Sequence, residues 1–194
     1  MGRKRSIDQG AVLDAAERVV ARDGAARLTL DAVASEAGIS KASVLYDYKS
    51  KPALIAALVE RSVAADNGFN QSRIDSLGPV DNATIRGRIL AAAEPLPAAF
   101  RDVALNLCAA LAQDAELRRT IQANQRAVIG DITTSSANPR GALLAYLALE
   151  GLKLLESLDY HSWPKPERDA ILADIAWLVD AEPGASPPPA PRKD

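Results

Sequence analysis

The stretch GISKASVLYDYKSKPAL, residues 38–54, combines a glycine turn with three lysines and two of the four tyrosines of the chain. Before it, Thr29 precedes the segment LDAVASEAG, whose apolar residues recur at the three- and four-residue steps of one helix face. After the glycine, Ser40 suits the N-cap of a second helix, in which we expect Val44 and Leu45 to be buried. Two short helices joined by a turn of about three residues have the geometry of a helix-turn-helix, whose second helix enters the major groove of DNA. Helical hairpins that never bind DNA share this spacing, so the residue types must decide.

The composition of the whole chain favours helices. It has 194 residues, of which 48% are hydrophobic and 4% aromatic, and much of the apolar fraction is alanine and leucine. Unbranched side chains lose little rotamer freedom in a helix, so this balance favours helix over β-sheet. We therefore predict an all-α protein of about nine helices.

Several absences in the sequence narrow the function. Cys108 is the single cysteine, so the chain can form no internal disulfide and no cysteine metal cluster, and we expect a cytoplasmic setting. No apolar stretch reaches the roughly 18–20 residues that span a bilayer, and the N-terminus lacks the apolar core of a signal peptide. His161 is the single histidine, in a predicted loop, and no phosphate-binding or dinucleotide-binding motif occurs. We predict no catalytic residue, no metal site, no cofactor and no membrane association, so the chain should not be an enzyme.

Apolar periodicity predicts helices on both sides of one break. The first helix should cover residues 8–23, and a long fourth helix should begin at Pro52, since proline suits the first turn of a helix. Residues 72–82 hold glycine, proline and turn-forming Asp and Asn, and form the clearest break; a domain boundary lies near it or within the helix before it. Beyond it, we predict helices over residues 83–94, 97–112, 114–134, 139–158 and 166–180.

At the N-terminal half of this pattern the chain resembles the TetR family of transcriptional regulators. The family signature runs from a threonine-hydrophobic helix start through A-x-x-A-G, a hydrophobic residue, S-K-G, an aromatic pair and S-K-x-x-L. The segment LTLDAVASEAGISKASVLYDYKSKPAL follows that run without a gap, and the resemblance covers residues 8–60. It implies a helix-turn-helix DNA-binding domain with a basic N-terminal arm over residues 1–51 and a helical regulatory and dimerisation domain over 52–180. The Pro-rich composition of residues 181–194 predicts a disordered tail.

The resemblance also implies which residues face DNA. Lys41 can contact a phosphate or a guanine edge, small neighbours let the helix approach the bases, and the Tyr46 hydroxyl can bond a phosphate. Lys49 and Lys51 could neutralise the DNA backbone without reading sequence. The expected DNA-binding residues are Thr29, Ser40, Lys41, Ala42, Ser43, Tyr46, Lys49 and Lys51.

Two residues depart from the family signature. Asp47 stands where histidine is common, and since phosphate repels a carboxylate, we expect it to turn toward a cytosine amine, a neighbouring lysine or solvent. Tyr48 replaces phenylalanine, so its ring should pack into the three-helix core with its hydroxyl at the edge.

Two alternatives remain for these basic and aromatic residues. Without the resemblance, the lysines could form only a solvated helix end and both tyrosines could be core. The N-terminal MGRKRS matches the loose pattern for N-myristoylation, yet it also suits a basic arm that reaches an adjacent minor groove.

A single helix-turn-helix reads few base pairs, so specificity normally requires a symmetric dimer. The segments RGALLAYLALEGLKLLESL and AILADIAWLV are apolar on more than one face, as expected of helices that pack against their own domain and a partner. In the TetR family this region is the usual dimer contact. The expected interface residues are Gly141, Ala145, Ala148, Leu152, Ile171, Ile175 and Leu178.

The resemblance further implies a small-molecule pocket among the middle helices. The candidate lining residues are Phe100, Ala104, Leu107, Leu111 and Tyr146, although such a stripe can equally be simple core. We thus predict a ligand-responsive regulator that represses transcription, binds a palindromic DNA operator as a homodimer and is released by an unidentified small-molecule effector. The alternative is a helical small-molecule binding or adaptor protein that does not bind DNA.

Overall fold

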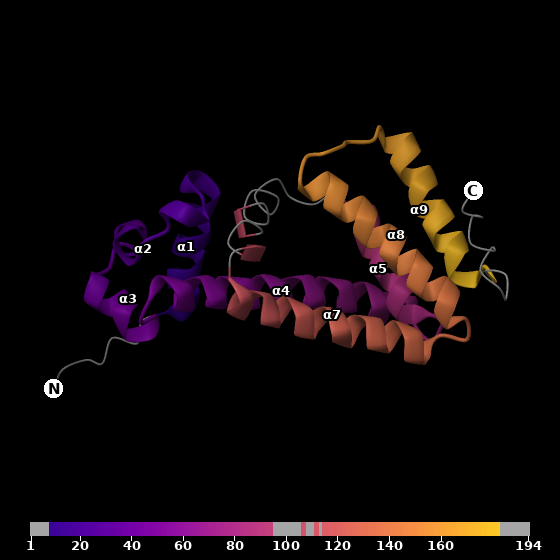
Figure 1. Ribbon diagram of the computed structural model, residues 1–194, viewed down its shortest axis with the longest axis horizontal. Helices are drawn as coiled ribbons and strands as arrows, with labels where there is room; N and C mark the ends of the chain where they lie inside the picture. The colour runs from indigo at the N-terminus through magenta and orange to yellow at the C-terminus, as the bar shows by residue number, and fades with distance from the viewer. Residues whose placement is uncertain (1–7, 95–105, 108–110, 113, 183–194) are drawn as a thin grey trace, which may run out of the picture.

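Figure 1 shows the computed structural model, which describes residues 8–94, 106–107, 111–112 and 114–182 as helices joined by short turns and loops. Three short helices gather at one end of the molecule, and a long helix leads from them to the helices at the other end. Within the described ranges the helices are α1 Gln9–Asp23, the 3-10 turn η1 Ala25–Arg27, α2 Leu30–Ala37, α3 Lys41–Asp47, α4 Lys51–Leu77, α5 Ala83–Ala93, α7 Ala115–Ser135, α8 Pro139–Ser157 and α9 Lys165–Asp180.

Side-chain caps fix the first turns of the short helices. The Thr29 hydroxyl accepts a hydrogen bond from the backbone N–H of Ala32 at 3.0 Å, and the Ser40 hydroxyl accepts one from that of Ser43 at 3.1 Å. Each bond satisfies a backbone donor that the helix itself leaves unpaired. Gly38 ends α2 with φ 65° and ψ 31°, a left-handed conformation that glycine adopts without a Cβ penalty. The turn predicted around Gly38 and both capping predictions are confirmed.

One hydrophobic cluster holds α1, α2, α3 and the start of α4 together. Val19, Leu28 and Leu58 are fully buried in it, and each such side chain contributes about 1.5–3 kcal/mol relative to exposure. The ring of Tyr48 packs against this cluster, as expected. Leu107 is also a buried member, so residues of the C-terminal half extend into the core of the N-terminal helices.

The break between the two halves is shorter than the sequence indicates. We expect it over residues 72–82, but α4 continues to Leu77, and only the segment from Gly78 to Asn82 leaves the helix. The hydroxyls of Ser72 and Ser76 bond backbone carbonyls one turn back, at Phe69 and Arg73, so these polar residues lie within the helix. The other described helix boundaries agree with the predicted ones within one residue or so.

A second hydrophobic cluster forms the far end of the molecule. Its buried residues come from α5, α7, α8 and α9. The α5 helix contacts the other three helices of the cluster and also α4. In Figure 1, α7 runs alongside α4 at the base, and α8 and α9 rise above them. Gly87 lets α4 and α5 approach closely, since a Cβ there would lie 2.4 Å from Cγ1 and 2.8 Å from Cα of Ile74.

Three predictions fall outside the described residues: the basic arm, most of the helix over 97–112 including Cys108, and the Pro-rich tail after residue 182. Among the helices that are described, none is both long and apolar enough to cross a bilayer. In the same ranges no group of three or more His, Cys, Asp or Glu residues is placed to hold a metal ion.

Candidate functional site

The candidate nucleic-acid interface is the outer face of α3 with the residues that flank it. Thr29, Ser40, Lys41, Ala42, Tyr46 and Lys49 are exposed, and Ser43 and Lys51 are half-buried. Tyr46 retains 79% of its accessible surface, more than a tyrosine packed in a core would. The alternative in which both tyrosines are core therefore does not hold for Tyr46, while Tyr48 does pack inside. A tyrosine, a lysine and small polar residues share this face.

Lys41 lies at the first turn of α3 and is paired in the free protein. Its Nζ is 2.8 Å from Oδ2 of Asp31 on α2, and both side chains are more than half exposed. An exposed pair of this kind is weak and screened by salt. The lysine can therefore exchange Asp31 for a DNA phosphate at small cost.

Leu45 does not lie in the core as predicted. It keeps 39% of its accessible surface, whereas its neighbour Val44 is fully buried. Because successive residues of a helix differ by about 100° in direction, the short α3 can direct only one of the two squarely at the three-helix core. Leu45 adds an apolar edge to the exposed face.

Asp47 contacts none of the partners we expected. Its Oδ1 accepts a hydrogen bond from Nε2 of Gln9, in the first turn of α1, at 3.2 Å. Its Oδ2 is buried and has no hydrogen-bond partner in the part of the chain that the structure describes. Asp47 thus faces the start of α1 instead of a lysine or solvent, and a contact with a cytosine amine stays a prediction. Burial, then the Asp47 charge, raises the pKa of neighbouring Tyr48.

Ion pairs fix α1 against the helices around it. Glu36 of α2 accepts hydrogen bonds from Arg18 and Arg22 of α1, each at 2.8 Å, and these bonds lower the pKa of the Glu36 carboxyl. On the other side, Arg61 of α4 contacts Asp14 and donates to the carbonyl oxygen of Gly10 at 3.2 Å. These contacts set the orientation of the α2–α3 pair relative to the long helix α4.

The structure does not bring the candidate pocket residues together. Leu107 and Leu111 belong to the cluster of the N-terminal helices, whereas Tyr146 is buried in the cluster of α5, α7, α8 and α9. Phe100 and Ala104 lie outside the described residues. The reason is that Tyr146 comes from another helix, α8, whose buried face packs into the second cluster.

A polar group that sequence reasoning missed lies near Tyr146. The Tyr146 hydroxyl donates a hydrogen bond to Oε1 of Gln125 on α7, and Arg88 on α5 is 7% exposed. Burial, followed by the negative charge of Glu150, raises the pKa of Tyr146 to about 12. Arg88 could have been noticed in the sequence IRGRIL, where it lies three residues after Ile85 and so on the same apolar face.

The predicted dimer residues are mostly inside the chain. Gly141, Ala145, Leu152 and Ile175 are buried, and Ala148, Ile171 and Leu178 are half-buried. A Cβ on Gly141 would lie 2.7 Å from the carbonyl oxygen of Leu178, so the small residues allow α8 to approach α9 of the same chain. A set of large apolar side chains remains exposed on the opposite edge of these helices: Leu144, Leu147, Leu154 and Leu155 on α8, and Trp177 on α9.

The helix-turn-helix and the helical second half define a class of one-component DNA-binding regulators, and comparisons with known proteins specify the family. A model described as "Bacterial regulatory proteins, tetR family" matches residues 12–58, and one described as "Tetracyclin repressor-like, C-terminal domain" matches residues 82–180. The chain belongs to the TetR family of transcriptional regulators, which are DNA-binding and ligand-binding proteins and not enzymes.

Solved structures share the fold at low sequence identity. A Streptomyces coelicolor A3(2) protein named as a transcriptional regulator superposes with a TM-score of 0.71 at 16% identity, over 89% of this chain and 98% of that one. A member of the TetR family from Streptomyces coelicolor A3 gives 0.66 at 20% identity, over 89% and 98%. The multidrug binding protein EbrR, in complex with ethidium, gives 0.65 at 20% identity, over 90% and 99%. No curated protein matched the chain.

Proposed function

We propose that the chain is a repressor that binds a palindromic operator as a homodimer and leaves it when a small molecule binds among the C-terminal helices. The observation that carries DNA recognition is the exposed face of α3, where Tyr46 is 79% exposed beside Lys41 on a helix whose opposite face is buried. Lysine and tyrosine there can bond phosphates and base edges. The caps at Thr29 and Ser40 stabilise the first turns of α2 and α3.

The homodimer is supported by the exposed apolar edge of α8 and α9. Leu144, Leu147 and Leu154 recur at intervals of three and seven residues, so they form one stripe, and Trp177 of α9 is 69% exposed. A stripe of large apolar side chains on a soluble helix pair marks an interaction surface. Two copies joined there by a twofold axis would present two α3 helices to successive half-sites.

A contact between the two halves of the chain would couple effector binding to DNA binding. Leu107 is buried among the N-terminal helices, and Leu117 at the start of α7 belongs to the same cluster. A ligand that favours a different position of these segments shifts the orientation of α3, by as much as its affinity differs between the two states. The EbrR structures are complexes with imidazole and with ethidium, which supports a small-molecule ligand for this chain.

DNA selection with random duplexes tests the proposal. We expect enrichment of a palindrome and a roughly 10- to 100-fold loss of affinity in Tyr46→Ala, as two or more phosphate or base contacts are removed. Tyr160→Ala is the matched control, because Tyr160 is 73% exposed but lies beyond α8, away from α3. No preference over random DNA at low salt, or equal effects of the two variants, would leave the non-DNA-binding adaptor as the better explanation.

A further inference from the structure

Arg88 is a buried cation that forms no ion pair or hydrogen bond with any residue that the structure describes. It retains 7% of its accessible surface, and its Nε makes no hydrogen bond. In the described part of the chain its guanidinium has neither an ion pair nor a hydrogen bond, whereas Arg168 of the same cluster has two bonds to Glu156 and one to a backbone carbonyl. An arginine cannot escape by losing its proton, so burial without a partner is costly.

The charges around Arg88 leave its donors unmatched. Glu150 and Asp66 raise the pKa of Tyr146 and Arg88 lowers it, so all three charges lie near the Tyr146 hydroxyl. Glu150 is already paired with Lys153 at 3.0 Å, and Asp66 makes no ion pair with Arg88. These carboxylates can balance the charge of the guanidinium at a distance, but they do not occupy the fork of N–H donors.

The side chains that are buried near Arg88 suit a molecule with an apolar body. Ile85 and Ile89, the neighbours of Arg88 on the same face of α5, are buried with Val128 of α7 and Leu149 of α8. The α5 helix lies among α4, α7, α8 and α9, so a ligand beside it would contact several helices at once (Figure 1). A guanidinium binds a carboxylate or a phosphate through two parallel hydrogen bonds. Among buried apolar side chains the singly charged carboxylate costs less to desolvate than a phosphate, so the surroundings favour a carboxylate.

We propose that Arg88 binds the carboxylate of the effector, and that the effector is a small carboxylic acid with an apolar body lying against Ile85, Ile89 and Leu149. The inference rests on the proposed function in that it assigns the chemistry of the ligand site. Tyr146 and Gln125, which are already bonded to each other, supply further polar atoms near Arg88. The carboxylate of the bound effector pairs with the buried guanidinium, which has no such partner in the free protein.

Two sets of matched probes test the charge preference without DNA. Benzoate, benzamide and benzamidine have the same shape with a negative, neutral and positive head; octanoate, octanamide and octylamine do the same for an aliphatic body. Isothermal titration of the full chain should show at least one carboxylate binding about 10- to 100-fold more tightly than its amide, the range for hydrogen bonds to charged groups. The cations should bind more weakly still.

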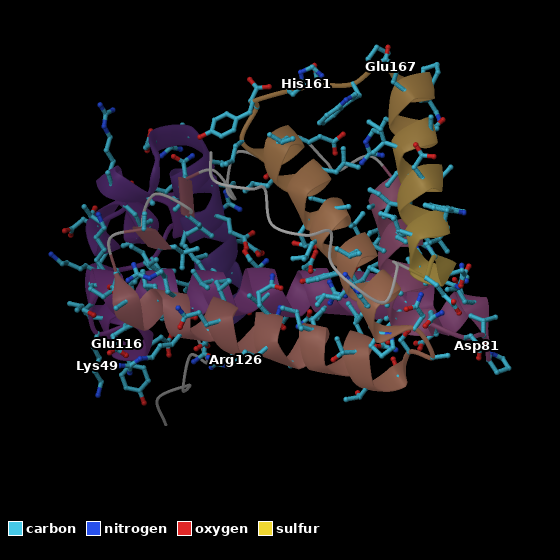
Figure 2. The ribbon with its side chains drawn as sticks, turned by 45° about the vertical axis from the view of Figure 1, so that its right-hand side comes forward. Lys49, Asp81, Glu116, Arg126, His161 and Glu167 are labelled. Carbon is cyan, nitrogen blue, oxygen red and sulfur yellow. The ribbon has the colours of Figure 1, made fainter. Side chains whose placement is uncertain are left out.

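Variants assign the preference to Arg88. Arg88→Met should reduce the carboxylate to the affinity of its amide, Arg88→Lys should retain part of the preference, and Arg126→Met, at an exposed position of α7, should retain all of it (Figure 2). Because its charge is unpaired, Arg88→Met should unfold at the same temperature as the parent or higher. A large loss of stability would show that Arg88 has a structural partner and would contradict the inference.

The remaining outcomes also decide. If neither carboxylate exceeds its amide, if a cation binds best, or if Arg88→Met keeps the preference, Arg88 is not the anchor of a carboxylic acid. Since no DNA is present, these results are separate from DNA selection. A chain that prefers carboxylates but ignores DNA would retain this inference and lose the repressor.

Discussion

The Nζ of Lys51 donates a hydrogen bond to the carbonyl oxygen of Ala26 at a distance of 2.6 Å. Lys51 is the first residue of α4, and Ala26 is the middle residue of η1, between α1 and α2. The bond therefore joins the start of the long helix to the connection that precedes the helix-turn-helix. A lysine expected to neutralise DNA phosphate also has a partner within the fold, and its contribution to DNA binding stays a prediction.

Lys51→Met should lower the free energy of unfolding by about 1 kcal/mol, the typical net contribution of one hydrogen bond. Lys49→Met is the matched control, because Lys49 is exposed and makes no hydrogen bond in the described ranges. Urea unfolding of the two variants separates a structural from an electrostatic role. Equal stabilities would mean that the Lys51 bond contributes nothing to the fold.

The helices around the turn were predictable because their ends depend on local chemistry. Thr29, Ser40 and Gly38 act on the backbone within three residues of themselves, so the sequence is enough to locate them. The predicted burial of Leu45 was wrong because burial depends on which neighbouring helices α3 contacts. The predicted break over residues 72–77 was wrong because serine and aspartate weaken a helix less than its packing stabilises it.

Gly87→Ala should destabilise the fold by about 1–3 kcal/mol, the usual cost of overpacking. The added Cβ would lie 2.8 Å from the backbone nitrogen and Cα of Ile74, so a helix must move to admit it. Gly68→Ala is the control in α4: nothing lies within 4 Å of its Cβ position, and alanine should stabilise that helix by about 0.5–1 kcal/mol. Thermal unfolding should thus shift in opposite directions in the two variants; a shift in the same direction would rule out close α4–α5 packing as the cause.

Tyr146 should make the fold sensitive to alkali. Its pKa is raised to about 12 in the folded chain by burial and then by Glu150, against about 10 in the unfolded chain, so the neutral hydroxyl is favoured by folding. The stabilisation is complete below about pH 10 and is lost as the pH rises from about 10 to about 12. Tyr146→Phe should remove this loss, and should cost about 1 kcal/mol at neutral pH through the bond to Gln125.

Urea unfolding of the parent and of Tyr146→Phe across this pH range measures the difference directly. The other tyrosines are present in both proteins, so their ionisation cancels. Parallel curves for the two proteins would show that Tyr146 ionises equally in the folded and unfolded chains.

The interior of the C-terminal half was less predictable than the turn. In the α8 segment RGALLAYLALEGLKLLESL apolar residues occupy nearly every direction, so periodicity cannot indicate which face meets α9. Gly141 proves to face α9 within the chain and Ala145 is buried, whereas larger leucines remain outside. The surroundings of Arg88 were equally hard to predict. Its charge on an apolar face is visible in the sequence, but its lack of partners depends on how the helices pack.

Asp47→Asn should raise affinity for DNA about two- to fivefold at low salt, as like charges a few ångströms apart in water repel by roughly 1 kcal/mol or less. The substitution keeps an oxygen to accept the Gln9 bond, so the contact between α1 and α3 is retained. Asp81→Asn removes the same charge at the far end of the molecule from Lys49 (Figure 2). Fluorescence anisotropy with labelled duplexes compares the DNA affinities of the two variants. An equal gain in both would show that the gain comes from net charge and not from the position of Asp47.

Leu147→Glu should convert a dimer to a monomer. Leu147 is 56% exposed at the centre of the stripe on α8, and a twofold axis would place a buried carboxylate near its own copy, which is strongly unfavourable. Leu90→Glu on α5 is the control, because Leu90 is 41% exposed but lies outside the stripe. Sedimentation analysis should give a monomer for the first variant and the parent mass for the second, while both keep the helical content of the parent.

Because specificity depends on two recognition helices, the monomer should also lose preference for a palindrome while keeping weak, salt-sensitive affinity for any duplex. If Leu147→Glu remains dimeric, the stripe on α8 is not the interface, and the half-buried residues Ala148, Ile171 and Leu178 become the next to test.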